Sequence, residues 1–183
     1  GAFAVRNLTA DALKHPIASI KVVPMEIGGG FGGKLPIYLD PVAALLSKRS
    51  GRPVKVVMSR TEVFEGSGPT SGVYIKLKAA AKGDRLTAVQ ATLCYEAGAF
   101  PGSPVGAGSM TMLAPYNIGA FELNGYDVVV NKPKVAAYRA PGAPQAQFAV
   151  ECALNELAVR LGIDPIELRL RNAVREGSRT IYG

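Results

Sequence analysis

The chain has 183 residues, of which 48% are hydrophobic and 19% are charged, with 21 glycines and 13 prolines. This composition excludes a disordered tail and predicts a globular protein rich in loops. The net charge of +7 comes from basic residues scattered along the sequence, and tryptophan is absent, so we expect no nucleic-acid partner. No apolar run is long enough to cross a membrane and no secretion signal is present, so we expect a cytoplasmic protein without membrane contact.

The N-terminal third of the sequence predicts helices separated by two short strands. Residues 5–14 place apolar side chains on one helical face, and a proline follows the next residue as a stop signal. Residues 20–27 and 54–58 are apolar runs typical of strands. The other signals are an N-cap and first-turn proline at Asp40 and Pro41, a C-terminal glycine at Gly51, and a capping box from Ser59 to Glu62.

The remainder of the sequence predicts a hairpin, a long loop, two strands and two helices. Residues 72–81 alternate apolar and polar side chains, and a short turn returns the chain through residues 86–95 as an antiparallel arm. The later predictions are a loop at 98–115, strands at 120–124 and 126–130, a helix from Gln145 to Gly162, and a helix start at Asp164. Helices and antiparallel strands without a βαβ repeat predict an α+β fold, with an antiparallel or mixed sheet and packed helices.

The run GGGFGGK at residues 28–34 is the strongest sign of a ligand site. Five of these seven residues are glycine, so the backbone can take positive φ and turn its N–H groups toward an oxyanion, a phosphate or a metal-oxo group. A tight turn is the simpler interpretation, but it needs fewer glycines. The nucleotide-binding patterns that fit these letters fail on context, because Leu35 and Pro36 follow the lysine where a Ser or Thr and a helix are required.

The run AYRAPGAPQ at residues 137–145 is the second candidate site. It presents Arg139 in a loop that leads straight into the longest helix, so an anion there would meet a guanidinium group and the N-terminus of a helix. A surface salt bridge is the alternative for this arginine. The whole sequence has one histidine and two cysteines, which excludes a zinc or non-haem iron site, so any metal must bring its own ligands.

GGGFGGK, AYRAPGAPQ and the later run VECALNELAVRLGIDPIELRLRN together resemble the molybdenum-binding subunit of the xanthine oxidase and aldehyde oxidase family, over essentially the whole chain. The resemblance implies that residues 1–183 are part of a molybdopterin-binding domain of the aldehyde oxidoreductase type, with a sub-lobe at 66–136. It implies a molybdenum–molybdopterin cofactor or its dinucleotide form. The implied cofactor-binding residues are Gly30, Phe31, Gly32, Gly33, Arg139 and Gln145. Of these, Phe31 through its backbone N–H and Arg139 through its guanidinium group would lie near the metal.

The resemblance also implies a reaction, in which a molybdenum hydroxylase oxidises an aldehyde or an N-heterocycle with oxygen from water. Leu35 stands where purine-oxidising members carry a glutamate, which favours substrates other than purines. The family's catalytic base would lie beyond Gly183, so we expect no catalytic residue in this sequence and no activity from the isolated chain. The implied partners are the rest of the molybdenum subunit, an iron–sulfur subunit with or without an FAD subunit, and a small-molecule substrate.

Two other functions remain open at the level of sequence. A non-catalytic module that binds an anion or a nucleotide would use the same two loops, and a structural or assembly domain would use neither. Molybdenum in the full-length protein would distinguish the hydroxylase from both.

Overall fold

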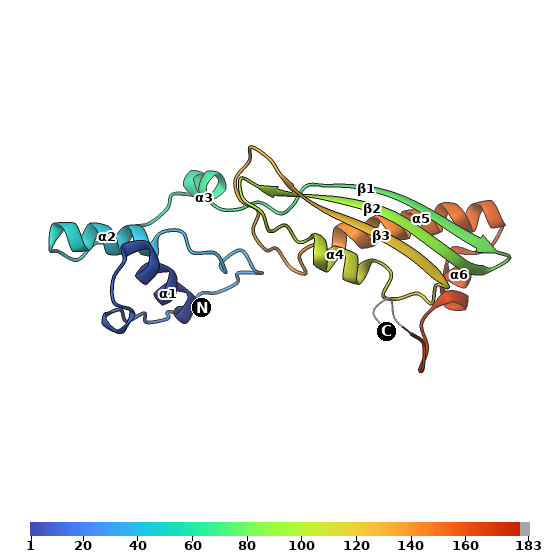
Figure 1. Cartoon of the computed structure of the whole chain (residues 1–183), viewed down its shortest axis with the longest axis horizontal. Helices are drawn as coiled ribbons and strands as arrows, with labels where there is room; N and C mark the ends of the chain where they lie inside the picture. Colours follow the sequence, from blue (N-terminus) through green and yellow to red (C-terminus); the bar gives the residue numbers. More distant parts are fainter. Residues whose placement is uncertain (180–183) are drawn as a thin grey trace. The chain divides into compact units, whose positions relative to one another are not determined.

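The computed structural model describes residues 1–179, which divide into two compact units. The first unit contains Gly1–Pro69 and Ala136–Arg139, and the second contains Thr70–Val135 and the chain from Ala140 onward. Figure 1 shows the elements of each unit along the chain. The second unit holds most of residues 66–136, where a sub-lobe is predicted, together with the helices that follow.

Short helices form the regular part of the first unit. They are α1 (Ala2–Leu13), the 3-10 helix η1 (Ile17–Ser19), α2 (Asp40–Ser50) and α3 (Arg60–Gly66), and α1 packs against α2. Helix α2 ends at Gly51 in the left-handed conformation, as predicted, but its N-cap is Leu39, and Asp40 is the first helical residue. At α3 the predicted capping box is confirmed: the N–H of Glu62 donates to Ser59 Oγ over 3.2 Å, and the N–H of Ser59 donates to the Glu62 carboxylate over 2.6 Å.

Residues 20–27 and 54–58 are not strands, so these two predictions are wrong for the structure. The chain runs through both segments without a turn or a bend, yet neither joins a sheet. A strand requires a neighbouring strand, and no other segment of the described chain forms a ladder of backbone hydrogen bonds with either one. The apolar pattern is typical of a strand, but no strand forms here within residues 1–179.

A three-stranded mixed sheet forms one layer of the second unit, in the order β1–β2–β3. Strands β1 (Val73–Lys82) and β2 (Arg85–Gly98) form the predicted antiparallel hairpin. Strand β3 (Ala120–Val129) pairs parallel to β2 and is continuous, so the predicted break into two strands is wrong. An added Cβ at Gly125, in the middle of β3, would lie 3.0 Å from Val105 Cγ2. This glycine therefore makes room for a neighbouring helix.

Three helices complete the second unit: α4 (Val105–Met112), α5 (Ala143–Leu161) and α6 (Pro165–Asn172). Helix α4 lies inside the segment predicted as a loop, which corrects that prediction. Helix α5 begins two residues before Gln145 and ends at Gly162, as predicted. At α6 the predicted cap is confirmed, because Asp164 Oδ1 accepts hydrogen bonds from the N–H groups of Ile166 and Glu167.

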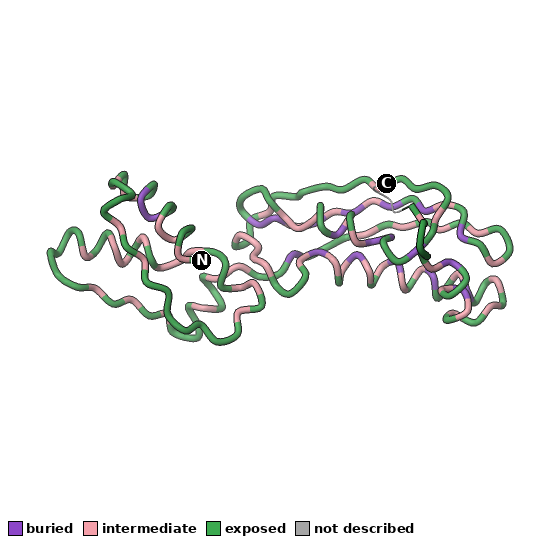
Figure 2. The backbone as a smooth tube through the Cα atoms, turned by 90° about the horizontal axis from the view of Figure 1, so that it is seen from below, coloured by how far each residue is buried: buried purple, intermediate pink, exposed green. Residues whose placement is uncertain are grey.

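The hydrophobic core lies between the sheet and its helices. Helix α5 runs along the sheet (Figure 1) and contacts β1, while α4 packs against α5 and β3. Figure 2 shows that the buried parts of the second unit gather on these elements. The fully buried side chains that define the core include Leu93, Tyr95, Met112, Leu113 and Leu168. Helices packed on a mixed sheet confirm the predicted α+β class.

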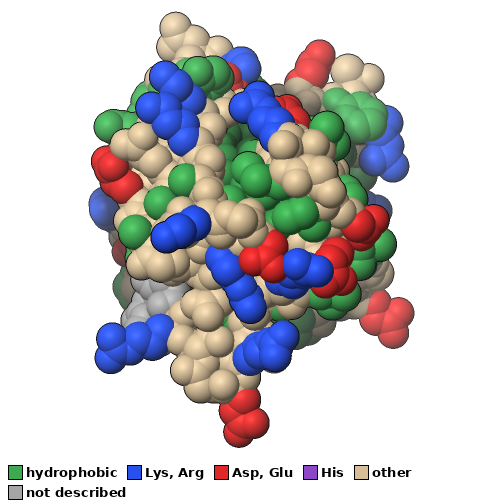
Figure 3. All heavy atoms as spheres, turned by 90° about the vertical axis from the view of Figure 1, so that its right-hand side faces the viewer, with side chains coloured by type: hydrophobic (Ala, Val, Ile, Leu, Met, Phe, Trp, Pro, Cys, Tyr) green, Lys and Arg blue, Asp and Glu red, His purple; other side chains and the backbone are tan. Residues whose placement is uncertain are grey.

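Charged residues of both signs mark the surface of the second unit. On the face in Figure 3, basic and acidic side chains lie among apolar ones. Arg171 forms ion pairs with Asp84 and with Glu167, each over 2.6 Å. Within residues 1–179, no helix is both long enough and apolar enough to cross a membrane.

Candidate cofactor-binding site

The glycine run folds into a tight loop held by its own backbone. The N–H of Gly33 donates to the carbonyl of Gly30 over 2.9 Å, and the N–H of Leu35 donates to that of Gly32 over 3.0 Å. Lys34 Nζ reaches back to the carbonyl of Ile27 over 2.5 Å. The lysine side chain therefore closes the loop on itself, a role that the sequence did not reveal.

The arginine loop meets the glycine loop within the first unit. The N–H of Arg139 donates to the carbonyl of Phe31 over 2.7 Å. At Gly32 an added Cβ would lie 2.9 Å from Ala137 Cβ and 3.1 Å from the Ala137 carbonyl oxygen. Two motifs about a hundred residues apart in sequence are thus joined by a backbone hydrogen bond, and only glycine permits this approach.

Both loops hold non-glycine residues in the left-handed region of the backbone. Phe31 has a φ of 49°, Arg139 of 28° and Ala140 of 56°, and Gly32 has 97°. Such a conformation costs on the order of 1–3 kcal/mol for each residue that carries a Cβ, and it concentrates at ligand sites. A simple surface turn would place glycine or asparagine at these positions. The strain therefore favours a ligand site over a turn.

The two loops offer hydrogen-bond donors that the protein itself does not use. Within residues 1–179, no protein acceptor pairs with the N–H groups of Phe31 and Gly32. The Arg139 side chain is exposed, and no described carboxylate forms an ion pair with it. Successive backbone N–H groups beside a guanidinium group suit an anion or a metal-oxo oxygen.

These donors fit a cofactor that carries its own metal ligands. Among the described residues, no three His, Cys, Asp or Glu side chains come together as a metal site. The loops instead present backbone N–H donors, one guanidinium group and a glycine surface that allows close approach. These features suit a group that exposes oxygen atoms. A molybdenum bound through the sulfurs of a pterin is such a group, so the residues present fit it.

Gln145 lies in the second unit and is engaged there. Its Nε2 donates to Thr70 Oγ1 over 3.3 Å and to the carbonyl of Ser71 over 3.4 Å. Its Oε1 is buried and has no protein partner among the described residues. The side chain thus holds the first turn of α5 against the chain that enters β1, and its predicted contact with the cofactor stays a prediction.

Tyr95 is a supporting residue that sequence reasoning missed. Its hydroxyl donates to the carbonyl of Gly142 over 2.8 Å, and burial raises the pKa of this phenol, which keeps it a donor. Gly142 has a φ of 87°, and a Cβ there would lie 2.4 Å from the Pro104 carbonyl oxygen. The period-two pattern places Tyr95 on the buried face of β2, but the sequence does not indicate its partner.

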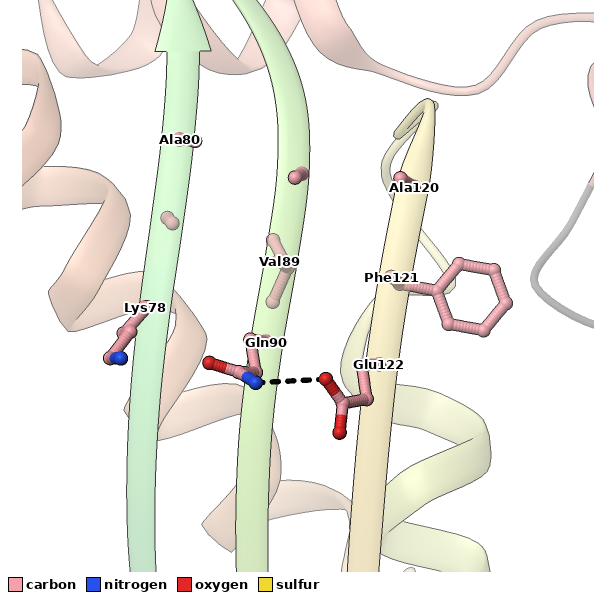
Figure 4. Close-up of a pocket in the computed structure, with 9 residues that line it drawn as sticks. Lys78, Ala80, Val89, Gln90, Ala120, Phe121 and Glu122 are labelled. Carbon is pink, nitrogen blue, oxygen red and sulfur yellow. Dashed lines mark hydrogen bonds between the residues drawn. The ribbon is translucent and has the colours of Figure 1, made fainter.

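A hollow on the open face of the sheet lacks the features of a reactive site. It has a volume of about 440 Å³ and is lined mainly by small side chains of the three strands (Figure 4). Gln90 Nε2 donates to Glu122 Oε2 over 2.8 Å (Figure 4). Hydrogen bonds from Asn124 and Gln90 lower the pKa of Glu122, so this carboxylate is a poor base.

The fold and the paired loops define a molybdopterin-binding domain. The chain matches the family described as "Molybdopterin cofactor-binding domain" over residues 1–173, and it belongs to that family. The resemblance inferred from the glycine and arginine motifs is confirmed.

Relatives from several organisms show which members of the family are similar to this chain. The chain is 36% identical to the xanthine dehydrogenase molybdenum-binding subunit of Escherichia coli O157:H7, over 94% of this chain and 24% of that protein. It is 32% identical to the nicotinate dehydrogenase large molybdopterin subunit of Eubacterium barkeri, over 97% of this chain and 43% of that protein. The chain therefore spans less than half the length of either relative.

Solved structures share the fold at a similar level of identity. The aldehyde oxidoreductase of Desulfovibrio gigas superimposes with a TM-score of 0.92 at 28% identity, over 98% of this chain and 20% of that one. Quinoline 2-oxidoreductase of Pseudomonas putida 86 superimposes with a TM-score of 0.90 at 30% identity, over 95% of this chain and 23% of that one. These matches confirm the fold predicted from the sequence.

Proposed function

We propose that this chain forms part of the cofactor pocket of a molybdenum hydroxylase, within a longer molybdenum-binding subunit. The observation that carries the proposal is the hydrogen bond from the Arg139 N–H to the Phe31 carbonyl, which joins the two motifs and leaves their other donors facing no protein acceptor. Family membership supports molybdopterin as the cofactor. The relatives that span several times the length of this chain support a longer subunit.

When bound, the molybdenum cofactor supplies an electron acceptor and an oxygen derived from water. The residues of this chain bind and orient it. The N–H groups of Phe31 and Gly32 donate to an oxygen of the cofactor, as preorganised donors do without reorganising during the reaction. The guanidinium group of Arg139 offsets negative charge on the same group, and Gly32 keeps the surface free of side-chain atoms.

The substrate class that we propose is an aldehyde or an N-heterocycle. The relatives include an aldehyde oxidoreductase, a nicotinate dehydrogenase, a quinoline 2-oxidoreductase and xanthine dehydrogenase subunits. Leu35, beside the glycine loop, is exposed and offers no hydrogen bond to a purine. An apolar side chain at this point favours a substrate that presents a hydrocarbon edge.

The base, the electron acceptors and the cellular location complete the proposal. The catalytic base and the iron–sulfur and flavin groups would lie on other parts of the subunit or on partner subunits, so the isolated chain would be inactive. A cytoplasmic location is part of the same proposal.

The experiment is oxidation of quinoline and of benzaldehyde by the full-length protein in water enriched in ¹⁸O, with an artificial electron acceptor. We expect the heterocycle to gain one oxygen from water, and the aldehyde to be converted to its acid. Product oxygen that comes from O₂ would contradict the proposal, as would a protein that carries molybdenum yet oxidises no member of either class.

A further inference from the structure

The first unit lacks a hydrophobic core of its own. Among its described residues only Thr9 and Ala10 are buried, whereas the second unit encloses the core between its sheet and its helices. A unit of this size needs buried apolar area to offset the conformational entropy that folding removes. The first unit therefore needs apolar cover from another polypeptide segment.

The exposed apolar side chains of residues 20–27 lie on one side of this segment. In this stretch Val23, Met25 and Ile27 alternate with their neighbours and are 61%, 78% and 59% exposed. Ile20 and Val22, on the opposite side, are half-buried. Alternate residues of an extended chain share a face, so Val23, Met25 and Ile27 form one apolar row, here named the outward row.

The backbone of this segment is also open to a partner. No described residue pairs with the N–H groups of Lys21, Val23 and Met25. In an extended chain these three groups share one edge, while Pro24 lies on the other edge and has no N–H to give. The edge from Lys21 to Met25 is therefore the uninterrupted one.

Residues 54–58 repeat the alternation, with Lys55 and Val57 on the exposed side. Val54, Val56 and Met58 are half-buried, whereas Val57 is 71% exposed. No hydrogen bond within the described chain uses the backbone N–H groups of this segment. Exposed apolar side chains with an open backbone edge are the features that accept an added strand.

We propose that residues 20–27 and 54–58 each pair with a β-strand from the remainder of the longer molybdenum-binding subunit, and that the strand beside residues 20–27 anchors the glycine loop. This inference rests on the proposed function, because it needs a longer subunit. The matched region is 24% of the E. coli relative and 20% of the D. gigas one, so most of each relative is available to supply the strands. Ile27 leads directly into Gly28, so pairing there fixes the point where the loop begins.

Amide hydrogen exchange with residue-level fragmentation tests this inference. It is measured on the full-length protein, prepared with and without molybdenum. We expect the amides of Lys21, Val23 and Met25 to exchange about a hundredfold more slowly than those of Val22 and Glu26 on the other edge, and alternate amides of residues 54–58 to be slowed to a similar extent. Leu93, in the middle of the sheet, serves as the control and should exchange slowly in every sample.

The preparation without molybdenum separates this inference from the proposed function. Slow exchange in both full-length preparations supports strand pairing, whatever the enzyme oxidises. Slow exchange only in the molybdenum-loaded protein would show that the cofactor orders the segment, and would overturn the inference. Equally fast exchange of the amides on the two edges would show that no strand lies beside Lys21 to Met25, and would overturn it too.

A pair of variants checks the outward row in the full-length protein. Met25→Lys places a charge on the row, and Glu26→Lys places the same charge on the other face of the segment. We expect Met25→Lys to speed exchange of the Val23 amide at least tenfold and Glu26→Lys to leave it nearly unchanged. Equal effects of the two variants would contradict a paired strand whose side chains pack beside the outward row.

Discussion

At the scale of single residues, the site depends on backbone conformations that side chains normally avoid. Phe31 and Arg139 both have positive φ, and a hydrogen bond of 2.7 Å joins their backbones. The sequence predicted that these two motifs share a site, because glycine-rich and arginine-bearing loops both suit anions. It could not predict the hydrogen bond or the contact of Gly32 with Ala137, since these depend on how distant segments pack.

Arg139→Ala in the full-length protein should impair turnover while it leaves stability nearly unchanged. The side chain is exposed and has no ion pair among the described residues, so its loss should cost no more than about 0.5 kcal/mol. Arg139→Lys should recover part of the activity, because a point charge replaces the planar guanidinium group. Steady-state rates and thermal unfolding measure both effects, and a wild-type rate in the alanine variant with molybdenum retained would remove Arg139 from the site.

Gly32→Val should abolish retention of the cofactor before it unfolds the protein. The new side chain meets Ala137, because even its Cβ would lie 2.9 Å from Ala137 Cβ at a φ of 97°. Gly83→Val is the matched control, since Gly83 has a φ of 60° but open space around it. Molybdenum content and circular dichroism of the two full-length variants make the comparison, and equal molybdenum in both would mean that the glycine loop is only a turn.

At the scale of elements, helix ends were predictable and strand pairing was not. The capping box of Ser59, the cap of Asp164 and the stop at Gly162 are local signals that the structure confirms. Residues 20–27 have a strand pattern but no partner strand among residues 1–179, because a local pattern does not specify which segment a strand pairs with. Helix α4 was predicted as a loop because its sequence contains two glycines, which disfavour helices. Gly108 is needed there, since a Cβ would lie 2.5 Å from the Tyr95 hydroxyl.

Asn172 connects α6 to the hairpin, and Asn172→Ala should destabilise the second unit. Its Oδ1 accepts from the buried N–H of Leu86 over 2.8 Å, and its Nδ2 donates to the carbonyl of Asp84 over 2.8 Å. Leaving a buried N–H without an acceptor costs about 1–3 kcal/mol. Urea unfolding should show this loss, whereas Asn124→Ala, at an exposed site, should show little. Equal stability of the two variants would contradict the structural role of Asn172.

Asp127 should make the second unit sensitive to acid. Hydrogen bonds from Ser103 and from the backbone N–H of Gly102 lower the pKa of Asp127 below its unfolded value. The carboxylate therefore adds stability above a pH of about 4. That stability is lost as the pH falls through the lowered pKa, because the folded state must then take up a proton. Between neutral pH and pH 3, the free energy of unfolding should fall less for Asp127→Asn than for wild type. Parallel curves of this free energy against pH would contradict the role of Asp127.

At the scale of the whole molecule, family and fold class were predictable, whereas the return of residues 136–139 to the first unit was not. The three motifs are spread over residues 28–172, and the α+β class follows from local patterns. The first unit takes in Ala136–Arg139 from far along the chain, and no composition change marks that return. The absence of a hydrophobic core among its described residues also could not be predicted, because the apolar residues are present in the sequence and only the structure shows them exposed.

The molybdenum and pterin content of the purified full-length protein tests the central claim most directly. Metal analysis by mass spectrometry and fluorescence of the oxidised pterin give both quantities for the same sample. We predict one molybdenum and one molybdopterin for each polypeptide, with both lost together in Gly32→Val. A folded full-length protein, expressed with molybdate and an intact cofactor pathway, that contains neither would contradict the account.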